Sequence, residues 1–362
     1  MTAHDPLESA PRGMPGWNLL EVRPAKPQRH RNLTVFPLCA DAQPDLSYLL
    51  LVDALGSGTV TIREVGSGTV PTLLAHNHSG TDVLILDGEQ LIGAKQNRLT
   101  NRSIILAAGL KTEIPVTCME HGRWHFQGEA FRSREKPRHA PSRVRRKARE
   151  VEAMYAHASH RAGVGVLSEA QVPVWNEISA YEERIGSRSA TGALDELYDH
   201  QSASLDDWAA QFPLVESQVG LLAFLGGHPL GLDVIGGQSL YARLHERFLG
   251  GYLMDALGDR GATQGRTSGR TAEEFLDAVR AAGRGIAPTV GKGTYRLLSG
   301  RAIGGELEDV VDGVPRLVHG SAFPGQTQES RVRPGGGDTD GQPLAPPSRR
   351  QGWSGGRGSR EG

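Results

Sequence analysis

The stretch Val83-Leu84-Ile85-Leu86-Asp87-Gly88-Glu89-Gln90-Leu91-Ile92-Gly93-Ala94-Lys95-Gln96-Asn97-Arg98 carries the strongest structural signals of this chain. Two short apolar runs flank Asp87-Gly88, a dipeptide that tolerates the positive φ angles of a type I′ turn. The pattern therefore predicts a hairpin that turns at these two residues. The second run passes into four long polar side chains at positions 95–98. Strand alternation would send them to opposite faces of a sheet, so that at least one pair faces inward.

The regions on either side of this stretch predict the fold class. Residues 32–130 alternate short apolar runs with turn signals, including 59–65 and 70–75 around a Gly-Ser-Gly turn, and we expect a β-rich half. Residues 161–324 combine helical stripes, at 174–185, 204–212 and 240–252, with hairpins around 226–229 and 312–313. This order predicts an α+β fold in which a β-rich N-terminal half packs with a helix-hairpin-helix-hairpin C-terminal half.

The remaining segments differ from these two halves in composition. Residues 1–31 hold five prolines without a hydrophobic period, which predicts a flexible arm, and 325–362 are poor in apolar residues, which predicts a disordered tail. Residues 131–160 read as a basic linker helix, because positions 132–150 carry nine Lys or Arg against two Glu. Such a block could contact an acidic partner, but solvated helix charge is the commoner interpretation, and we do not expect nucleic-acid binding.

Composition limits the class of protein. The chain has 362 residues, 38% of them hydrophobic, which is enough for a large core. Its apolar runs are far shorter than the ~20 residues that span a bilayer, and its start lacks the apolar region of a secretory signal. Only two cysteines, Cys39 and Cys118, occur, so a disulfide framework is not expected. We therefore expect a cytoplasmic protein without membrane contact.

Polar residues that could carry chemistry lie between positions 87 and 124. Cationic forks, amides and an indole face are what a nucleotide-like ligand needs for its phosphates, base edges and base plane. The alternative is an internal network of ion pairs that holds the sheet together. The candidate ligand-binding residues are Lys95, Gln96, Asn97, Arg98, Asn101, Arg123 and Trp124.

Glu89 and Glu120 are the candidate catalytic carboxylates. If they converge, one could polarise water while the other protonates a leaving group, as in glycoside cleavage. Each could equally serve as the counter-ion of a nearby cation. In the second half, polar residues embedded in apolar hairpins, among them Asp233, His319 and Ser321, should mostly find partners inside the protein, although a few could reach a pocket.

Histidines near Cys118 raise the question of a metal. His76 and His78 share a strand face, and His121 and His125 lie near Cys118 and Glu120. A metal needs three or four ligands that meet at one point, and neither a helical HExxH pattern nor a CxxC pattern is present. We expect no metal and no cofactor.

The polar segments resemble a known family. The run from Leu86 through the Gly93-Ala94-Lys95-Gln96-Asn97-Arg98 segment, then Ile114-Pro115-Val116 and the segment Cys118-Met119-Glu120-His121-Gly122-Arg123-Trp124, are similar to the ARG and rhodanese-phosphatase-superfamily-associated protein domain, a bacterial family. ARG stands for ADP-ribosylglycohydrolase. The likeness extends over about residues 32–324, with looser matches around 189–193, 215–220, 231–233 and 318–323.

The resemblance implies a link to ADP-ribose and NAD-derived metabolism. Two functions from different classes follow. In the first, the protein binds or processes an ADP-ribose-type nucleotide, with Lys95, Arg98 and Arg123 on the phosphates and Trp124 on the base, and could hydrolyse a glycosidic bond. In the second, it is a non-enzymatic scaffold that partners an ADP-ribose-processing enzyme. A cleft that holds Glu89 and Arg123 would favour the first function, and a motif buried without a cavity would favour the second.

Overall fold

A computed structural model describes residues 19–41, 45–66, 71–120, 130–134, 136–158, 171–187, 189, 192–259, 261, 267–288 and 290–325. Within these ranges, nine strands form one antiparallel sheet in the order β1-β3-β13-β14-β18-β17-β16-β15, with β2 paired to β3. The strands are β1 (Arg23–Pro24), β2 (Gln28–His30), β3 (Leu33–Cys39), β13 (Gln218–Leu225), β14 (His228–Ile235), β15 (Gly283–Ile286), β16 (Thr294–Ser299), β17 (Ala302–Val311) and β18 (Val314–Pro324).

Two smaller sheets come from the segment between β3 and α2, which also contains the short helix α1. One has the order β10-β7-β4, and the other has the order β12-β8-β9-β11-β6-β5. Their strands are β4 (Leu49–Leu50), β5 (Val60–Glu64), β6 (Thr72–Asn77), β7 (Val83–Ile85), β8 (Gln90–Gly93), β9 (Arg98–Thr100), β10 (Ile104–Leu106), β11 (Lys111–Cys118) and β12 (Phe131–Arg132).

Seven α-helices lie within the described ranges, after a short 3-10 helix η1 (Leu19–Glu21). They are α1 (Leu51–Gly56), α2 (Ser142–Ala158), α4 (Val172–Ile185), α5 (Leu194–His200), α6 (Ser202–Ala209), α7 (Gln238–Leu257) and α8 (Gly269–Arg280). Ser268 is the N-cap residue of α8. Its side chain accepts a hydrogen bond from Thr271 N at 3.2 Å, which satisfies one of the free N–H groups at the helix start.

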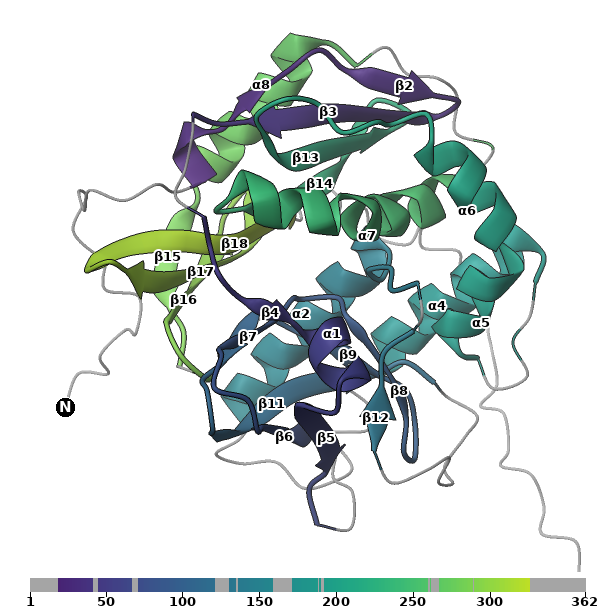
Figure 1. The fold of residues 1–362 in the computed structure, drawn as a ribbon. Helices are drawn as coiled ribbons and strands as arrows, with labels where there is room; N and C mark the ends of the chain where they lie inside the picture. Colours follow the sequence, from purple (N-terminus) through teal and green to yellow (C-terminus); the bar gives the residue numbers. More distant parts are fainter. Residues whose placement is uncertain are drawn as a thin grey trace, which may run out of the picture. The chain divides into compact units, whose positions relative to one another are not determined.

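The large sheet is covered by helices on both faces. Alternate residues of β3 point to opposite faces, so that Val35 packs in the cluster that contains α7, while Phe36 packs in the cluster that contains α8. Figure 1 shows α7 running along β13 and β14. Because both faces are buried, the central strands are almost continuously apolar.

The expected division into a β-rich N-terminal half and a helix-hairpin C-terminal half is wrong. Strands β1 to β3 belong to the same sheet as β13 to β18, and the helices are distributed between the sheets instead of forming a helix-hairpin unit. The reason is the pairing of β3 with β13, which joins segments about 180 positions apart. Residues 19–31, which we expected in a flexible arm, form η1, β1 and β2. The expected tail lies outside the described residues after Gly325.

The hairpin predicted at Asp87-Gly88 is also wrong. Strand β7 pairs with β10 and β4, and β8 pairs with β9 and β12, so the chain crosses from one sheet to another at this point. Gly88 does have a positive φ of 79°, but its environment adds a second reason for glycine. A Cβ at Gly88 would lie 2.7 Å from Cδ of Arg145. The hairpins β5-β6, β13-β14 and β17-β18 are confirmed.

Candidate functional site

Helix α2 points two of its arginines, Arg145 and Arg149, into the protein. Val144, Ala148 and Val151 bury one stripe of the helix in the core. Arg145 and Arg149, which are four positions apart and therefore neighbours on the helix surface, are directed to a second buried region. The interpretation of this basic block as solvated charge is wrong for these two residues, because Arg145 is 3% exposed and the side chain of Arg149 is 9% exposed.

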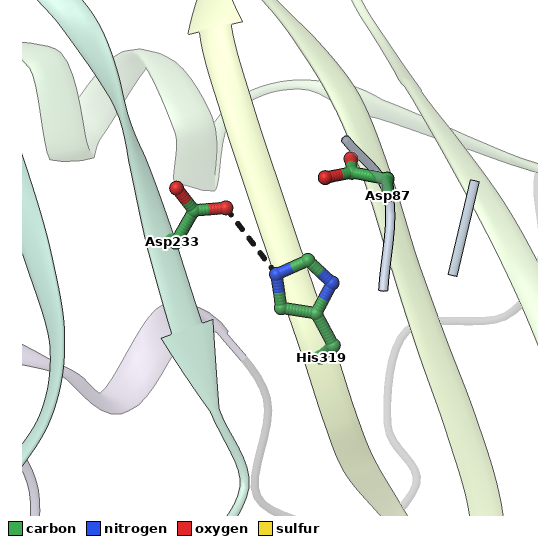
Figure 2. Close-up of side chains that lie close together, drawn as sticks. All are labelled: Asp87, Asp233 and His319. Carbon is green, nitrogen blue, oxygen red and sulfur yellow. Dashed lines mark hydrogen bonds and ion pairs between the residues drawn. The ribbon is translucent and has the colours of Figure 1, made fainter. Parts of the chain in front are cut away.

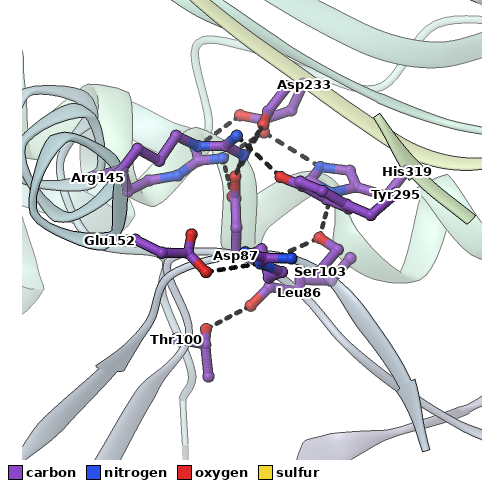
Figure 3. A network of polar contacts seen from close by, with 12 residues as sticks. Leu86, Asp87, Thr100, Ser103, Arg145, Glu152, Asp233, Tyr295 and His319 are labelled. Carbon is purple, nitrogen blue, oxygen red and sulfur yellow. Dashed lines mark hydrogen bonds and ion pairs between the residues drawn. The ribbon is translucent and has the colours of Figure 1, made fainter. Parts of the chain in front are cut away.

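The two arginines bind a pair of buried aspartates, and Figure 3 shows Arg145 with Asp87 and Asp233. Arg145 grips Asp233 with both terminal nitrogens, at 2.9 Å from Nη1 to Oδ2 and 2.6 Å from Nη2 to Oδ1. Asp87 accepts from Arg145 and from Arg149, and from Ser321 Oγ at 2.8 Å. Bidentate Arg–carboxylate contacts are among the strongest polar contacts in proteins. This Asp87-Asp233 cluster joins α2, β14, β18 and the segment between β7 and β8.

The arginines keep both aspartates ionised. Burial on its own would raise the pKa of each carboxyl, but Arg145 and Arg149 outweigh burial for Asp87 and hold its pKa well below the usual range. For Asp233, Arg145 and a hydrogen bond from His319 lower the pKa to about 2. Tyr252 Oη also donates to Asp233 Oδ2 at 2.8 Å.

The cluster could be mistaken for a metal site. Asp87, Asp233 and His319 place one ligand atom each within 4.8 Å of one another, all buried (Figure 2). Both carboxylates, however, already form ion pairs with arginine guanidinium groups. His319 engages both ring nitrogens, with Nε2 3.3 Å from Asp233 Oδ1 and Nδ1 2.6 Å from Ser103 Oγ. The negative charge of the two aspartates is therefore balanced by arginine, and these three residues do not fit a resident metal ion.

Because of this cluster, the free energy of unfolding should fall as the pH is lowered into the acid range. The pKa of Asp233 is about 2 in the folded protein against an ordinary 3.8, so its contribution is present above pH 4 and is lost as the pH falls toward 2. We expect a loss of about 2 kcal/mol in the free energy of unfolding from this residue, because one pKa unit corresponds to about 1.4 kcal/mol. Urea melts at pH 7, 4, 3 and 2 measure it.

The matched control for this pH effect is Asp233→Asn. The variant should be less stable than the wild type at pH 7 and should change less between pH 4 and pH 2. Glu89, whose pKa burial raises, acts with the opposite sign, since its ionised form costs stability at neutral pH and that cost falls on acidification. An equal acid dependence in wild type and Asp233→Asn would contradict the prediction.

The candidate ligand-binding residues near Arg98 form a buried network. Arg98 is fully buried and pairs with Glu64 at 3.2 Å from Nη2 to Oε1. Gln96 Nε2 donates to the backbone oxygen of Glu120 at 3.0 Å, and Glu120 Oε2 accepts from Asn97 N at 3.1 Å. These contacts tie together the β8-β9 connection and the end of β11.

The other candidates are placed in three ways. Asn101 accepts from Thr117 Oγ1 at 2.8 Å and is buried, Lys95 is half-buried, and Arg123 and Trp124 lie outside the described residues. Glu120 is buried in the network around Arg98 and does not line the cleft that contains Arg247. The ligand and catalytic roles of these residues therefore stay predictions.

Glu89 lies apart from that network, at a small enclosed gap that it lines together with Arg138 and Arg247. Its backbone N–H is held by Thr100 Oγ1 at 3.0 Å, and its carboxylate pairs with Arg247 of α7. Arg247 and Arg138 line both a small gap at Glu89 and an adjoining cleft of about 990 Å³ between α6 and α7. His139 N donates to Arg247 O at 3.1 Å, which fixes the segment of Arg138 beside α7.

Several buried polar atoms at Glu89 and Arg247 lack a hydrogen-bond partner. Glu89 Oε2 and two nitrogens of Arg247, Nε and Nη1, are buried without a hydrogen-bond partner, although Glu89 is 4% and Arg247 7% exposed. Burial raises the pKa of Glu89 in spite of the opposing charge of Arg247. Buried groups that lack partners cost stability, and Arg247 of this pair also lines the larger cleft.

Sequence reasoning missed several of these residues. Arg145, Arg149, Arg138 and Arg247 were not singled out, because nothing in a charge pattern distinguishes an inward arginine from a solvated one. Helical spacing offered one signal, since Val144, Ala148 and Val151 mark the buried stripe of α2 that its arginines flank. The expectation that Asp233, His319 and Ser321 find internal partners is confirmed.

Comparisons with known proteins give one match. The family described as the ARG and Rhodanese-Phosphatase-superfamily-associated Protein domain matches residues 21–323. No curated protein matches the chain, and no solved structure does. No helix in the described part of the chain has the length and the apolar character needed to cross a membrane.

Proposed function

The chain belongs to the family of ARG and Rhodanese-Phosphatase-superfamily-associated Protein domains, and from this premise we propose that it binds an ADP-ribose-type nucleotide in the cleft between α6 and α7. The family name records an association with two groups of proteins, one of which acts on ADP-ribose conjugates. The observation that carries the proposal is Arg247, which lines that cleft and pairs with the buried Glu89, with unpartnered atoms on both side chains.

Charged and apolar side chains both line the cleft. The cations are Lys136, Arg138, Arg243 and Arg247, the carboxylates are Asp53, Asp206 and Glu246, and the apolar residues include Ala209, Pro213 and Leu214. Asp206 pairs with Lys136 and Arg138, so a phosphate would compete with this carboxylate for the two cations. Arginine forks suit phosphate oxygens, and apolar side chains suit the face of a base. The volume of about 990 Å³ lies within the usual range of ligand sites.

Glu89 supports an extension from binding to glycosidic-bond hydrolysis. A carboxyl group with a raised pKa can hold the proton that a leaving group needs. In the reaction we propose, water forms the new bond to the anomeric carbon as the glycosidic bond breaks. The proton of Glu89 passes to the leaving atom, and the proton released by water restores the carboxyl group.

Binding is tested with ADP-ribose by isothermal titration calorimetry. Arg247→Ala should weaken the affinity by roughly 10- to 100-fold, because hydrogen bonds to charged groups contribute about 1.5 to 3 kcal/mol. The matched control is Arg270→Ala, which removes the same charge from a side chain that is 89% exposed. Arg270 belongs to α8 and does not line the cleft. Absence of ADP-ribose binding in the wild type, or equal affinity in Arg247→Ala, would refute the proposal.

The second candidate function is a non-enzymatic scaffold for an ADP-ribose-processing enzyme. It is favoured by the network around Arg98, in which Gln96, Glu120 and Asn97 bond to one another and none of these residues lines the Arg247 cleft. Wild-type protein that binds such an enzyme and no nucleotide would favour this function over the first.

A further inference from the structure

A second cavity, of about 470 Å³, lies between the start of α2, the turn between β13 and β14, and the segment after α7. It shares no lining residue with the cleft at Arg247. Asp259, which lines it, follows the end of α7 at Leu257, and the ten positions from Arg247 to Leu257 rise by about 15 Å along the helix at ~1.5 Å per residue. The cavity is therefore distinct from the proposed nucleotide cleft.

Arginines dominate the charge of this cavity. Arg143 and Arg146 line it together with His228 and one carboxylate, Asp259. Arg143 Nη2 lies 3.4 Å from Asp259 Oδ2, and both side chains are about one third exposed, so this pair is weak. Within the described ranges, no ion pair involves Arg146, and its Nε is buried without a hydrogen-bond partner.

The start of α2 does not by itself supply the anion site. Ser142 N, the first donor of the helix, already gives its hydrogen bond to Asp255 Oδ2 at 2.8 Å. The attraction for an anion comes from the side chains of Arg143 and Arg146, one turn apart on α2. A planar guanidinium with free N–H groups matches the oxygens of a phosphate.

The remaining walls are apolar. Leu225, Pro229, Leu230 and Pro324 contribute them, and the volume lies at the lower end of the range of small-molecule sites. We propose that this cavity binds a phosphate-bearing small molecule, with the phosphate on Arg143 and Arg146 and the non-phosphate part against the apolar walls. The site is independent of the nucleotide cleft at Arg247.

The test titrates pyrophosphate, at constant ionic strength, into the full chain and follows binding by calorimetry. The background is Arg247→Ala, which weakens phosphate binding at the first cleft. In that background, Arg146→Ala should weaken pyrophosphate binding by roughly 10- to 100-fold, because it removes charge-assisted hydrogen bonds, and Arg270→Ala should leave it unchanged.

A conservative variant distinguishes a loss of binding from a loss of folding in Arg146→Ala. Arg146→Lys keeps the charge but cannot present the planar fork, and it should weaken binding as well while its urea melt matches that of its parent. Affinity in both Arg146 variants equal to that of the parent overturns the proposal, as does a lack of saturable binding in the Arg247→Ala background. Loss of ADP-ribose binding only in Arg247→Ala would bear on the nucleotide cleft and not on this cavity.

Discussion

Arg145→Ala should lower the free energy of unfolding by about 5 kcal/mol, at the upper end of what breaking a buried ion pair costs. Arg145 binds Asp233 through both terminal nitrogens and also binds Asp87, so its loss leaves two buried carboxylates short of positive charge. Arg149 and Ser321 still hold Asp87, whereas the side chains left on Asp233, among the residues that the structure describes, are Tyr252 and His319. A urea melt at pH 7 measures the loss.

The control for this prediction is Arg270→Ala. Arg270 forms an exposed pair with Glu274, and exposed pairs contribute at most about 1 kcal/mol. Arg145→Ala with a stability close to that of Arg270→Ala would mean that the Asp87-Asp233 cluster does not hold α2 against the large sheet. Arg145→Lys should recover only part of the loss, because lysine cannot grip Asp233 with two parallel hydrogen bonds.

Glu89→Gln should abolish most hydrolysis of an ADP-ribose conjugate while ADP-ribose still binds. Glutamine keeps the size and the hydrogen bond to Arg247 but cannot give up a proton. General acid catalysis contributes about 10²- to 10⁴-fold, and the rate should fall by that factor. Chromatographic measurement of released ADP-ribose follows the reaction.

Glu274→Gln is the matched control for Glu89→Gln, since Glu274 is 60% exposed and belongs to α8. It should hydrolyse at the wild-type rate. If the wild type binds ADP-ribose but hydrolyses no conjugate, the catalytic part of the account fails and the binding part stands. If Glu89→Gln hydrolyses at the wild-type rate, Glu89 is not the acid.

Local patterns in this sequence predict local structure well. The apolar stripe of Val174, Ile178 and Tyr181 corresponds to the buried face of α4, and the predicted turn at Asp312 and Gly313 has positive φ angles of 52° and 76°. Both features are set by residues a few positions apart, so their physics is visible in the sequence. A cytoplasmic location stays a prediction.

Long-range pairing is what the sequence could not reveal. Asp87-Gly88 looks like a hairpin turn because Asp and Gly suit positive φ angles, yet Asp87 is a partner of Arg145 and Arg149 on α2. The same limit applies to Arg247, which meets Glu89 across 158 positions. The sequence likewise does not distinguish Glu89, which pairs with an arginine that lines a cleft, from Arg98, which is buried in a network.

The most direct test of the account is a crystal structure of the protein with ADP-ribose. We expect the diphosphate between Arg138 and Arg247, the base against Ala209, Pro213 and Leu214, and the distal ribose on the side of the cleft where Arg138 and Arg247 also border the gap at Glu89. Density for the nucleotide at another place, or a cleft without nucleotide at saturating ADP-ribose, would contradict the proposed function.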